Sequence, residues 1–171
     1  MNASGFGAFV PFGEIPPGTL FLDHSLGGAG DTAILLKVGR GESRHNFVRL
    51  FDRAAAGRGV QMPALGSALL TDDRAIVALP DYFIEVENSV DNIVWESDAG
   101  FVKAAMCADS DGALLLKAFR NRNRDDCECD LFDLATGIEA TLDRASVGFR
   151  RWSVVRRDAY GNREELYRFE L

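Results

Sequence analysis

The chain has 171 residues, of which 47% are hydrophobic and 10% aromatic, and its formal net charge at pH 7 is −7. This hydrophobic content suffices for a packed core and excludes an intrinsically disordered chain. The acidic charge argues against nucleic acid as a partner, and no apolar run reaches the length of a membrane span, so we expect no membrane partner either.

Residues 1–17 are predicted to form an N-terminal arm, interrupted by Gly and Pro and carrying Phe6, Phe9 and Phe12 at regular intervals. The first part of this arm has neither Lys nor Arg and no continuous apolar stretch, which predicts the absence of a secretory signal peptide. The three cysteines do not suit a disulfide framework. These features predict a cytoplasmic protein.

Residues 18–171 are predicted to form a single β domain, because short runs rich in Val, Ile, Leu and Phe alternate with turn residues and helical periodicity is weak. The segment between residues 75 and 86 predicts a tight hairpin, with Pro80 in its turn. The spacing favours an all-β, antiparallel sandwich or barrel of about eleven short strands. The predicted strands span residues 19–23, 32–38, 46–51, 75–79, 82–86, 92–96, 102–107, 113–119, 127–132, 150–156 and 164–169.

Two stretches of the chain, residues 33–54 and 113–135, are nearly the same sequence. Lys37 matches Lys117, and a Leu-Phe-Asp motif closes both stretches after one extra residue in the second. Because the order, the charges and the strand-loop-strand pattern are all kept, duplication explains the match better than chance.

The repeat predicts two related halves, roughly residues 18–80 and 90–171, packed around an approximate two-fold axis. Residues alternate between the two faces of a strand, so one face of the first repeat should be buried. The residues expected on this core face are Ile34, Leu36, Val48 and Leu50.

Cys127 and Cys129 could begin a metal site, with Cys107 or His45 completing it. Their spacing is shorter than that of usual ligand pairs, and a meander of strands would place Cys107 at the opposite end from Cys127. The repeat also aligns Cys129 with Val48 on the expected core face. We therefore expect buried, hydrophobic cysteines, no metal and no other cofactor.

Candidate catalytic groups are few. His24 lies between Asp23 and Ser25, but catalytic triads are assembled from separated segments, so this tripeptide is more typical of a turn. The repeat also supplies Asp52 and Asp133 at matched positions, and two carboxylates brought together could act in acid–base catalysis. An Asp at the end of a strand is also common in turns.

Arginines in the two matched loops form the strongest surface feature. Alternating Arg and Asn can bind carboxylates or phosphates through planar, bidentate contacts. The alternative is a solvated turn, neutralised by the acidic residues that follow the second loop. The predicted binding residues are Arg40, Arg44, Arg120, Arg122 and Arg124.

The sequence contains no recognisable catalytic motif, so the leading hypothesis is a non-enzymatic, soluble binding or interaction protein. It would contact a protein partner through the charged hairpin loops or the aromatic N-terminal arm. The alternative is a small hydrolase or lyase that uses carboxylates or His24 in a cleft between the two halves. A pocket with several titratable groups of perturbed pKa would favour the enzyme.

Overall fold

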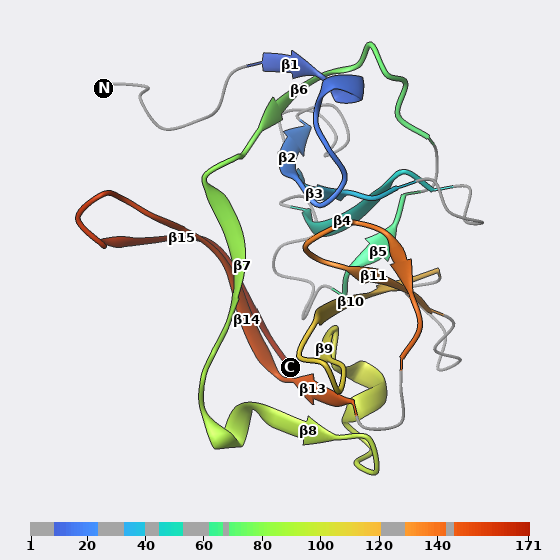
Figure 1. Cartoon of the computed structure of the whole chain (residues 1–171), viewed down its shortest axis with the longest axis vertical. Coiled ribbons are helices and arrows are strands. Elements are labelled where there is room, and N and C mark those ends of the chain that lie inside the picture. Colours follow the sequence, from blue (N-terminus) through green and yellow to red (C-terminus); the bar gives the residue numbers. More distant parts are fainter. Residues whose placement is uncertain are drawn as a thin grey trace.

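The structure is a computed structural model that describes residues 9–23, 33–39, 45–52, 62–66, 69–120, 129–142 and 146–171. Strands make up 52% of it, and its helices are short 3-10 turns, including η1 (Phe12–Glu14), η3 (Val90–Asn92) and η4 (Phe101–Lys103). The all-β prediction is therefore confirmed. The strands form two sheets that do not close into a barrel (Figure 1).

The larger sheet has twelve strands in the order β1-β6-β2-β3-β4-β5-β10-β9-β13-β8, with β11 on β10 and β12 on β11. In the first half its strands are β1 (Phe9–Pro11), β2 (Leu20–Asp23), β3 (Ala33–Lys37), β4 (Phe47–Asp52), β5 (Ala64–Leu65) and β6 (Ala75–Ala78). In the second half they are β8 (Ile93–Trp95), β9 (Met106–Ala108), β10 (Leu114–Phe119), β11 (Cys129–Asp133), β12 (Glu139–Ala140) and β13 (Val147–Phe149).

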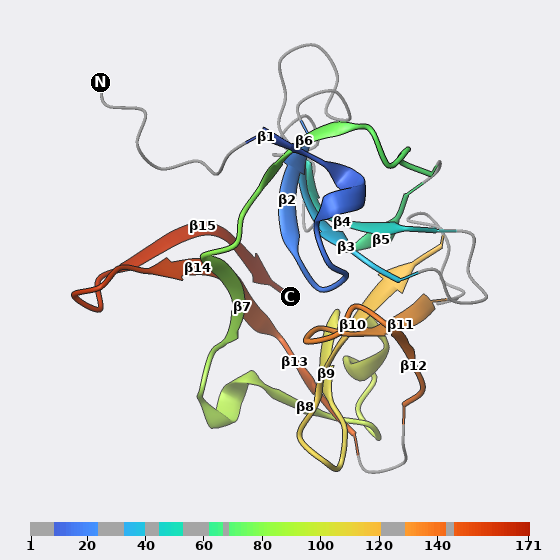
Figure 2. The same cartoon turned by 45° about the horizontal axis from the view of Figure 1, so that its top comes forward.

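The smaller sheet has the order β15-β14-β7. Its strands are β7 (Tyr82–Val86), β14 (Arg151–Arg157) and β15 (Arg163–Glu170). β7 and β14 run antiparallel side by side, and the tip of the β14–β15 hairpin extends away from the body (Figures 1 and 2).

Strand pairing in the first half recurs in the second. The antiparallel pairs β1–β6, β6–β2, β2–β3, β3–β4 and β4–β5 return as β8–β13, β13–β9, β9–β10, β10–β11 and β11–β12. A short 3-10 helix follows the first strand of each set, and β7 and β14 follow the last. Corresponding positions below are defined by these recurring pairs.

Every predicted strand overlaps a strand of the structure, but the prediction for residues 102–107 is wrong over its first part, where the chain forms η4 and β9 begins only at Met106. The described residues form fifteen strands rather than about eleven. Those without a prediction (β1, β5, β12 and β13) are two or three residues long. The predicted hairpin between residues 75 and 86 is wrong. β6 pairs with β1 and β2, whereas β7 pairs with β14, so the turn at Pro80 is a corner between the sheets.

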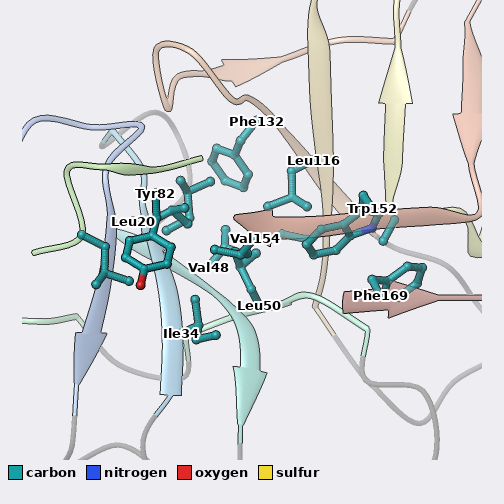
Figure 3. Packing of buried hydrophobic residues seen from close by; sticks show 14 of the residues in the cluster. Leu20, Ile34, Val48, Leu50, Tyr82, Leu116, Phe132, Trp152, Val154 and Phe169 are labelled. Atoms are coloured by element: carbon teal, nitrogen blue, oxygen red, sulfur yellow. The ribbon is translucent and has the colours of Figure 1, made fainter. Parts of the chain in front are cut away.

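The main core is formed by residues from both sheets, with Trp152 and Val154 of the smaller sheet among the buried side chains (Figure 3). The expected core face of the first repeat is confirmed, because Ile34, Leu36 and Val48 are buried in this cluster together with Leu50. Side chains on the opposite face of the same strands are also covered and form a second cluster with Phe12.

The two matched lysines make corresponding contacts. Lys37 Nζ donates to the carbonyl oxygens of Phe12 (2.8 Å) and Ile15 (2.6 Å), and it lies 4.5 Å from the centre of the Phe12 ring. Lys117 Nζ donates to the carbonyl oxygen of Phe101 (2.7 Å) and lies 3.8 Å from the centre of that ring. Each lysine thus fixes the 3-10 helix of its own half, η1 or η4, to the sheet.

A turn of the second half closes directly on the backbone of the first half. Gly137, which follows β11, has a positive φ of 66° and accepts a hydrogen bond of 2.8 Å from Gly39 N. A Cβ atom at Gly137 would lie only 2.4 Å from Gly18 N. Only glycine fits this position, because both the backbone conformation and the space exclude a side chain.

Candidate functional site

Arg120 is the only predicted binding residue within the described part of the chain, at the end of β10. Its guanidinium forms an ion pair of 2.6 Å with Asp130, whose side chain is 5% exposed. The arginine therefore neutralises a buried carboxylate of its own chain. The other predicted binding residues, Arg40, Arg44, Arg122 and Arg124, lie outside the described residues.

The candidate catalytic residues do not form a described site. His24 lies outside the described residues, and its neighbour Asp23 is buried in an ion pair of 3.2 Å with Arg74. Asp133 accepts hydrogen bonds of 2.7 Å from the backbone and the hydroxyl of Thr136, so it shapes the turn after β11. This is the turn function that the sequence offered as the alternative.

The expectation that Cys127 and Cys129 are both buried is wrong for Cys129, and Cys127 lies outside the described residues. Cys107 is buried, and burial raises the pKa of its thiol, but Cys129 is only partly buried. Phe132 opposes Leu116 in the main core, so Cys129, three residues earlier, lies on the other face of β11. The error arose because the sequence match does not follow the strand register. Among the described residues, no three His, Cys, Asp or Glu side chains cluster as metal ligands would.

A cleft of about 420 Å³ lies between the two halves. One wall is β7, and the other is formed by the turn before β10 and the end of β11. The lining residues are Gly18, Leu20, Leu36, Tyr82, Phe83, Ile84, Gly112, Ala113, Leu114, Asp133, Leu134 and Ala135. A cleft between the halves was expected only for the enzyme alternative, and none of these residues except Asp133 was a predicted site residue.

The wall formed by β7 is the edge of a sheet, because in the described structure β7 pairs only with β14. Glu87 N donates to Arg151 O, and this hydrogen bond fixes which residues of β7 bond to β14, because hydrogen-bonded and non-hydrogen-bonded pairs alternate along an antiparallel ladder. It follows that the backbone N–H and C=O groups of Ile84 and Val86 point away from β14. The side chains of Ile84 and Val86 pack against the main core.

The outer face of the same sheet is covered by ion pairs. Glu85 contacts Arg157 (2.6 Å) and Arg163 (3.0 Å), and Glu87 contacts Arg151 (3.2 Å) and Arg168 (3.1 Å). The hydrogen bond from Arg157 is the main reason that the pKa of Glu85 lies below its usual value. These pairs join β7 to both strands of the C-terminal hairpin.

The titratable side chains that line the cleft are Tyr82 and Asp133. Burial raises the pKa of Tyr82, so its hydroxyl stays protonated at neutral pH. Asp133 is already hydrogen-bonded to Thr136, and the other lining residues are glycine, alanine and large apolar residues. The cleft therefore suits the binding of apolar side chains better than acid–base catalysis. One sequence signal could have located it: the predicted strand 150–156 is followed by a further strand, 164–169, whereas 82–86 is followed directly by the first predicted strand of the second half.

No family model matches the chain, and neither the curated proteins nor the solved structures contain one that is significantly similar to it. Within the described residues, no helix is long and apolar enough to cross a membrane. The functional proposal below therefore depends on the geometry of the cleft and its strand edge.

Proposed function

We propose that the protein is a non-enzymatic binding protein and that its binding site is the cleft along β7. The observation that carries this proposal is the position of an apolar cleft of about 420 Å³ beside a strand edge with which no described strand pairs. Covering apolar surface is favourable, and an edge offers backbone donors and acceptors for pairing. A hydrolase or lyase has less support, because Asp133 is the only carboxylate among the described residues that line the cleft.

The arginine loops and the aromatic arm are secondary candidate surfaces. Arg122 and Arg124 belong to the loop that starts at Arg120, and a basic loop on an acidic protein would mainly raise the association rate with an acidic partner. The arm is supported by Phe9, whose side chain is 73% exposed on β1.

We also infer that the two halves arose by duplication of one unit. The recurring strand pairs support this, as do the corresponding contacts of Lys37 and Lys117 with Phe12 and Phe101. The sequence match covers only the β3–β4 and β10–β11 segments, whereas the recurring pairs extend over both halves. Duplication matters for function because it allows one half to be compared with the other, position by position.

The experiment that tests the binding site compares two tryptophan variants. Ala135 and Ala159 are both exposed alanines in turns, but only Ala135 lines the cleft. A partner captured from the source cell would be identified by mass spectrometry, purified, and titrated against the wild-type protein and both variants. Ala135→Trp should weaken its binding at least about tenfold, and Ala159→Trp should leave it unchanged. Equal binding by all three proteins would move the site elsewhere, and Arg122→Ser with Arg124→Ser would be tested next.

A further inference from the structure

The outer edge of β14 shows how an edge of the smaller sheet is covered. β15 pairs antiparallel with β14 and directs alternate apolar side chains inward. Phe169 stacks on Trp152 with ring centres 5.1 Å apart, and the Tyr167 ring packs edge-on against Trp152 at 5.7 Å. Leu171, the next alternate residue, also packs on the main core.

β7 occupies the position in the first half that β14 occupies in the second. The preceding strands fix the correspondence, because Val77 lies opposite Leu22 as Val147 lies opposite Ala108. The same offset along the chain takes Ile84 of β7 to Val154 of β14, and these two residues lie opposite each other. Tyr82 precedes Ile84 by two residues, as Trp152 precedes Val154. Tyr82 therefore corresponds to Trp152, and both rings are buried in the main core (Figure 3).

The facing walls correspond as well. Phe51 lies opposite Ile34 in the first half, and Leu134 N donates to the carbonyl of Leu114 in the second, so Leu134 corresponds to Phe51. Tyr167 of β15 packs on Phe51, with ring centres 4.7 Å apart. Leu134 instead lines the cleft. The cleft is thus the counterpart of the space that β15 fills.

We propose that the cleft binds an extended segment of a partner protein, which adds to β7 as an antiparallel strand. This inference rests on the proposed function and names the occupant of that site. The added strand would continue the sheet β15-β14-β7 and bond to the outward N–H and C=O groups of Ile84 and Val86. Its apolar side chains would enter the cleft between Tyr82 and Leu134.

The sequence pattern of the occupant follows from the sheet. Residues opposite Tyr82 and Ile84 share their inward face, so they are apolar, as Phe169 and Tyr167 are opposite Trp152 and Val154. The intervening residues lie on the outer face beside Glu85 and Glu87. The carboxylates of Glu85 and Glu87 are already paired with arginines, so basic side chains in the occupant complement the net charge of −7 rather than these two groups.

A second copy of this chain fits the edge less well. Pairing of β7 with β7 of another copy would bring together two chains that each carry a net charge of −7, and this like charge opposes their association. The inward side chains of β7 are also already packed in its own core, so they would not fill the cleft of another copy.

The test uses three synthetic peptides of one sequence, Thr-Lys-Tyr-Lys-Phe-Lys-Leu-Thr, with blocked ends. The first is unmodified, the second is N-methylated on Tyr, Phe and Leu, and the third is N-methylated on the three Lys. Only the second loses the N–H groups that would face β7, although the second and third carry the same number of methyl groups. Binding to the full-length protein is measured by calorimetry, and amide exchange at Ile84 and Val86 by NMR.

The unmodified and Lys-methylated peptides should bind with similar affinity, and the Tyr/Phe/Leu-methylated peptide at least roughly tenfold more weakly, because it cannot form the backbone hydrogen bonds. The bound peptide should slow amide exchange at Ile84 and Val86, whereas Phe83 and Glu85, already bonded to β14, should change little. Ala135→Trp should weaken binding of the unmodified peptide, and Ala159→Trp should leave it unchanged.

Equal binding of both methylated peptides, or unchanged exchange at Ile84, would overturn strand addition. So would a lack of peptide binding. The cleft itself would still stand as a binding site if Ala135→Trp weakened the natural partner, so failure of this inference and failure of the proposed function give different results. Self-association of the protein that the unmodified peptide reverses would identify a second copy as the occupant and overturn the assignment to a different protein.

Discussion

The corners at Trp152 and Tyr82 have corresponding strands but different covers. At Trp152 the chain supplies β15, and two aromatic rings close the corner. At Tyr82 no described strand takes this place, and an apolar cleft remains. A strand edge with an adjacent cleft can therefore contribute in two ways. When a strand of the same chain covers the edge, the contact stabilises the fold, and when no strand of the chain covers it, the edge is available for binding.

The largest expected effect compares the two aromatic rings. Trp152→Ala should reduce the free energy of unfolding by about 3–5 kcal/mol, since it removes a ring that is packed on both sides. Tyr82→Ala should cost at least about 1 kcal/mol less, because one side of its ring already faces the cleft. Urea unfolding of both variants measures the difference. Equal losses of unfolding free energy would show that Tyr82 is packed as completely as Trp152, and that its corner is not open to the cleft.

Lys37 and Lys117 test whether the two halves are built alike. Lys37→Met and Lys117→Met should each destabilise the protein by about 1.5–3 kcal/mol, because each removes charged hydrogen bonds to buried backbone carbonyls. Lys103 is exposed, and Lys103→Met should change stability by less than about 0.5 kcal/mol. Thermal unfolding of the three variants provides the measurement. A loss confined to one half would mean that the corresponding contacts differ in weight.

Arg120 tests whether the basic loop begins with a structural residue. Arg120→Ser should destabilise the protein by about 1–2 kcal/mol, because the buried Asp130 carboxylate loses its charged partner. Combining it with Asp130→Asn should recover part of this loss, and a double-mutant cycle in urea would report the coupling. Additive single effects would show that the ion pair contributes no net stability, which would return Arg120 to the candidate binding residues.

The smallest expected effect concerns the ion pairs that join β7 to the hairpin. Glu85→Gln should cost less than about 1 kcal/mol at pH 7, as is usual for surface pairs. Since Arg157 holds the pKa of Glu85 below its usual value of about 4.3, this stability is fully present above that value and is lost as the pH falls through the lower folded-state pKa. Urea midpoints of both proteins should therefore converge in acid. A difference that persists at low pH would indicate packing rather than charge.

The strands of four or more residues were predictable from the sequence, because each carries an apolar run bounded by turn residues. The pairing of the strands with one another was less predictable. Pro80 indicates a turn, but a local turn does not determine whether the chain folds back as a hairpin or crosses to another sheet, as β6 and β7 do. The core face of β11 was also missed, since Phe132 lies opposite Leu116 in the main core and Cys129, aligned by the repeat with Val48, lies on the other face.

The candidate site was harder to predict than the strands. Its walls combine Leu20, Tyr82, Ala113 and Leu134, which come from four separate segments and carry no reactive group that a motif search detects, apart from the Tyr82 hydroxyl. The predicted arginines were found instead because charge stands out in a sequence. An apolar cleft depends on which strand is left without a neighbour, and that is a property of the assembled sheets.

The contact at Gly137 also bears on how the molecule folds. Gly39 N reaches Gly137 O across most of the chain, and the contact involves backbone alone. Closing so long a loop costs entropy before any side-chain packing offsets it, which slows formation of the contact. The hydrogen bond between Gly39 and Gly137 is therefore expected to form late in folding, after each half has formed its own hairpins. Its breaking should be among the first steps by which the halves separate.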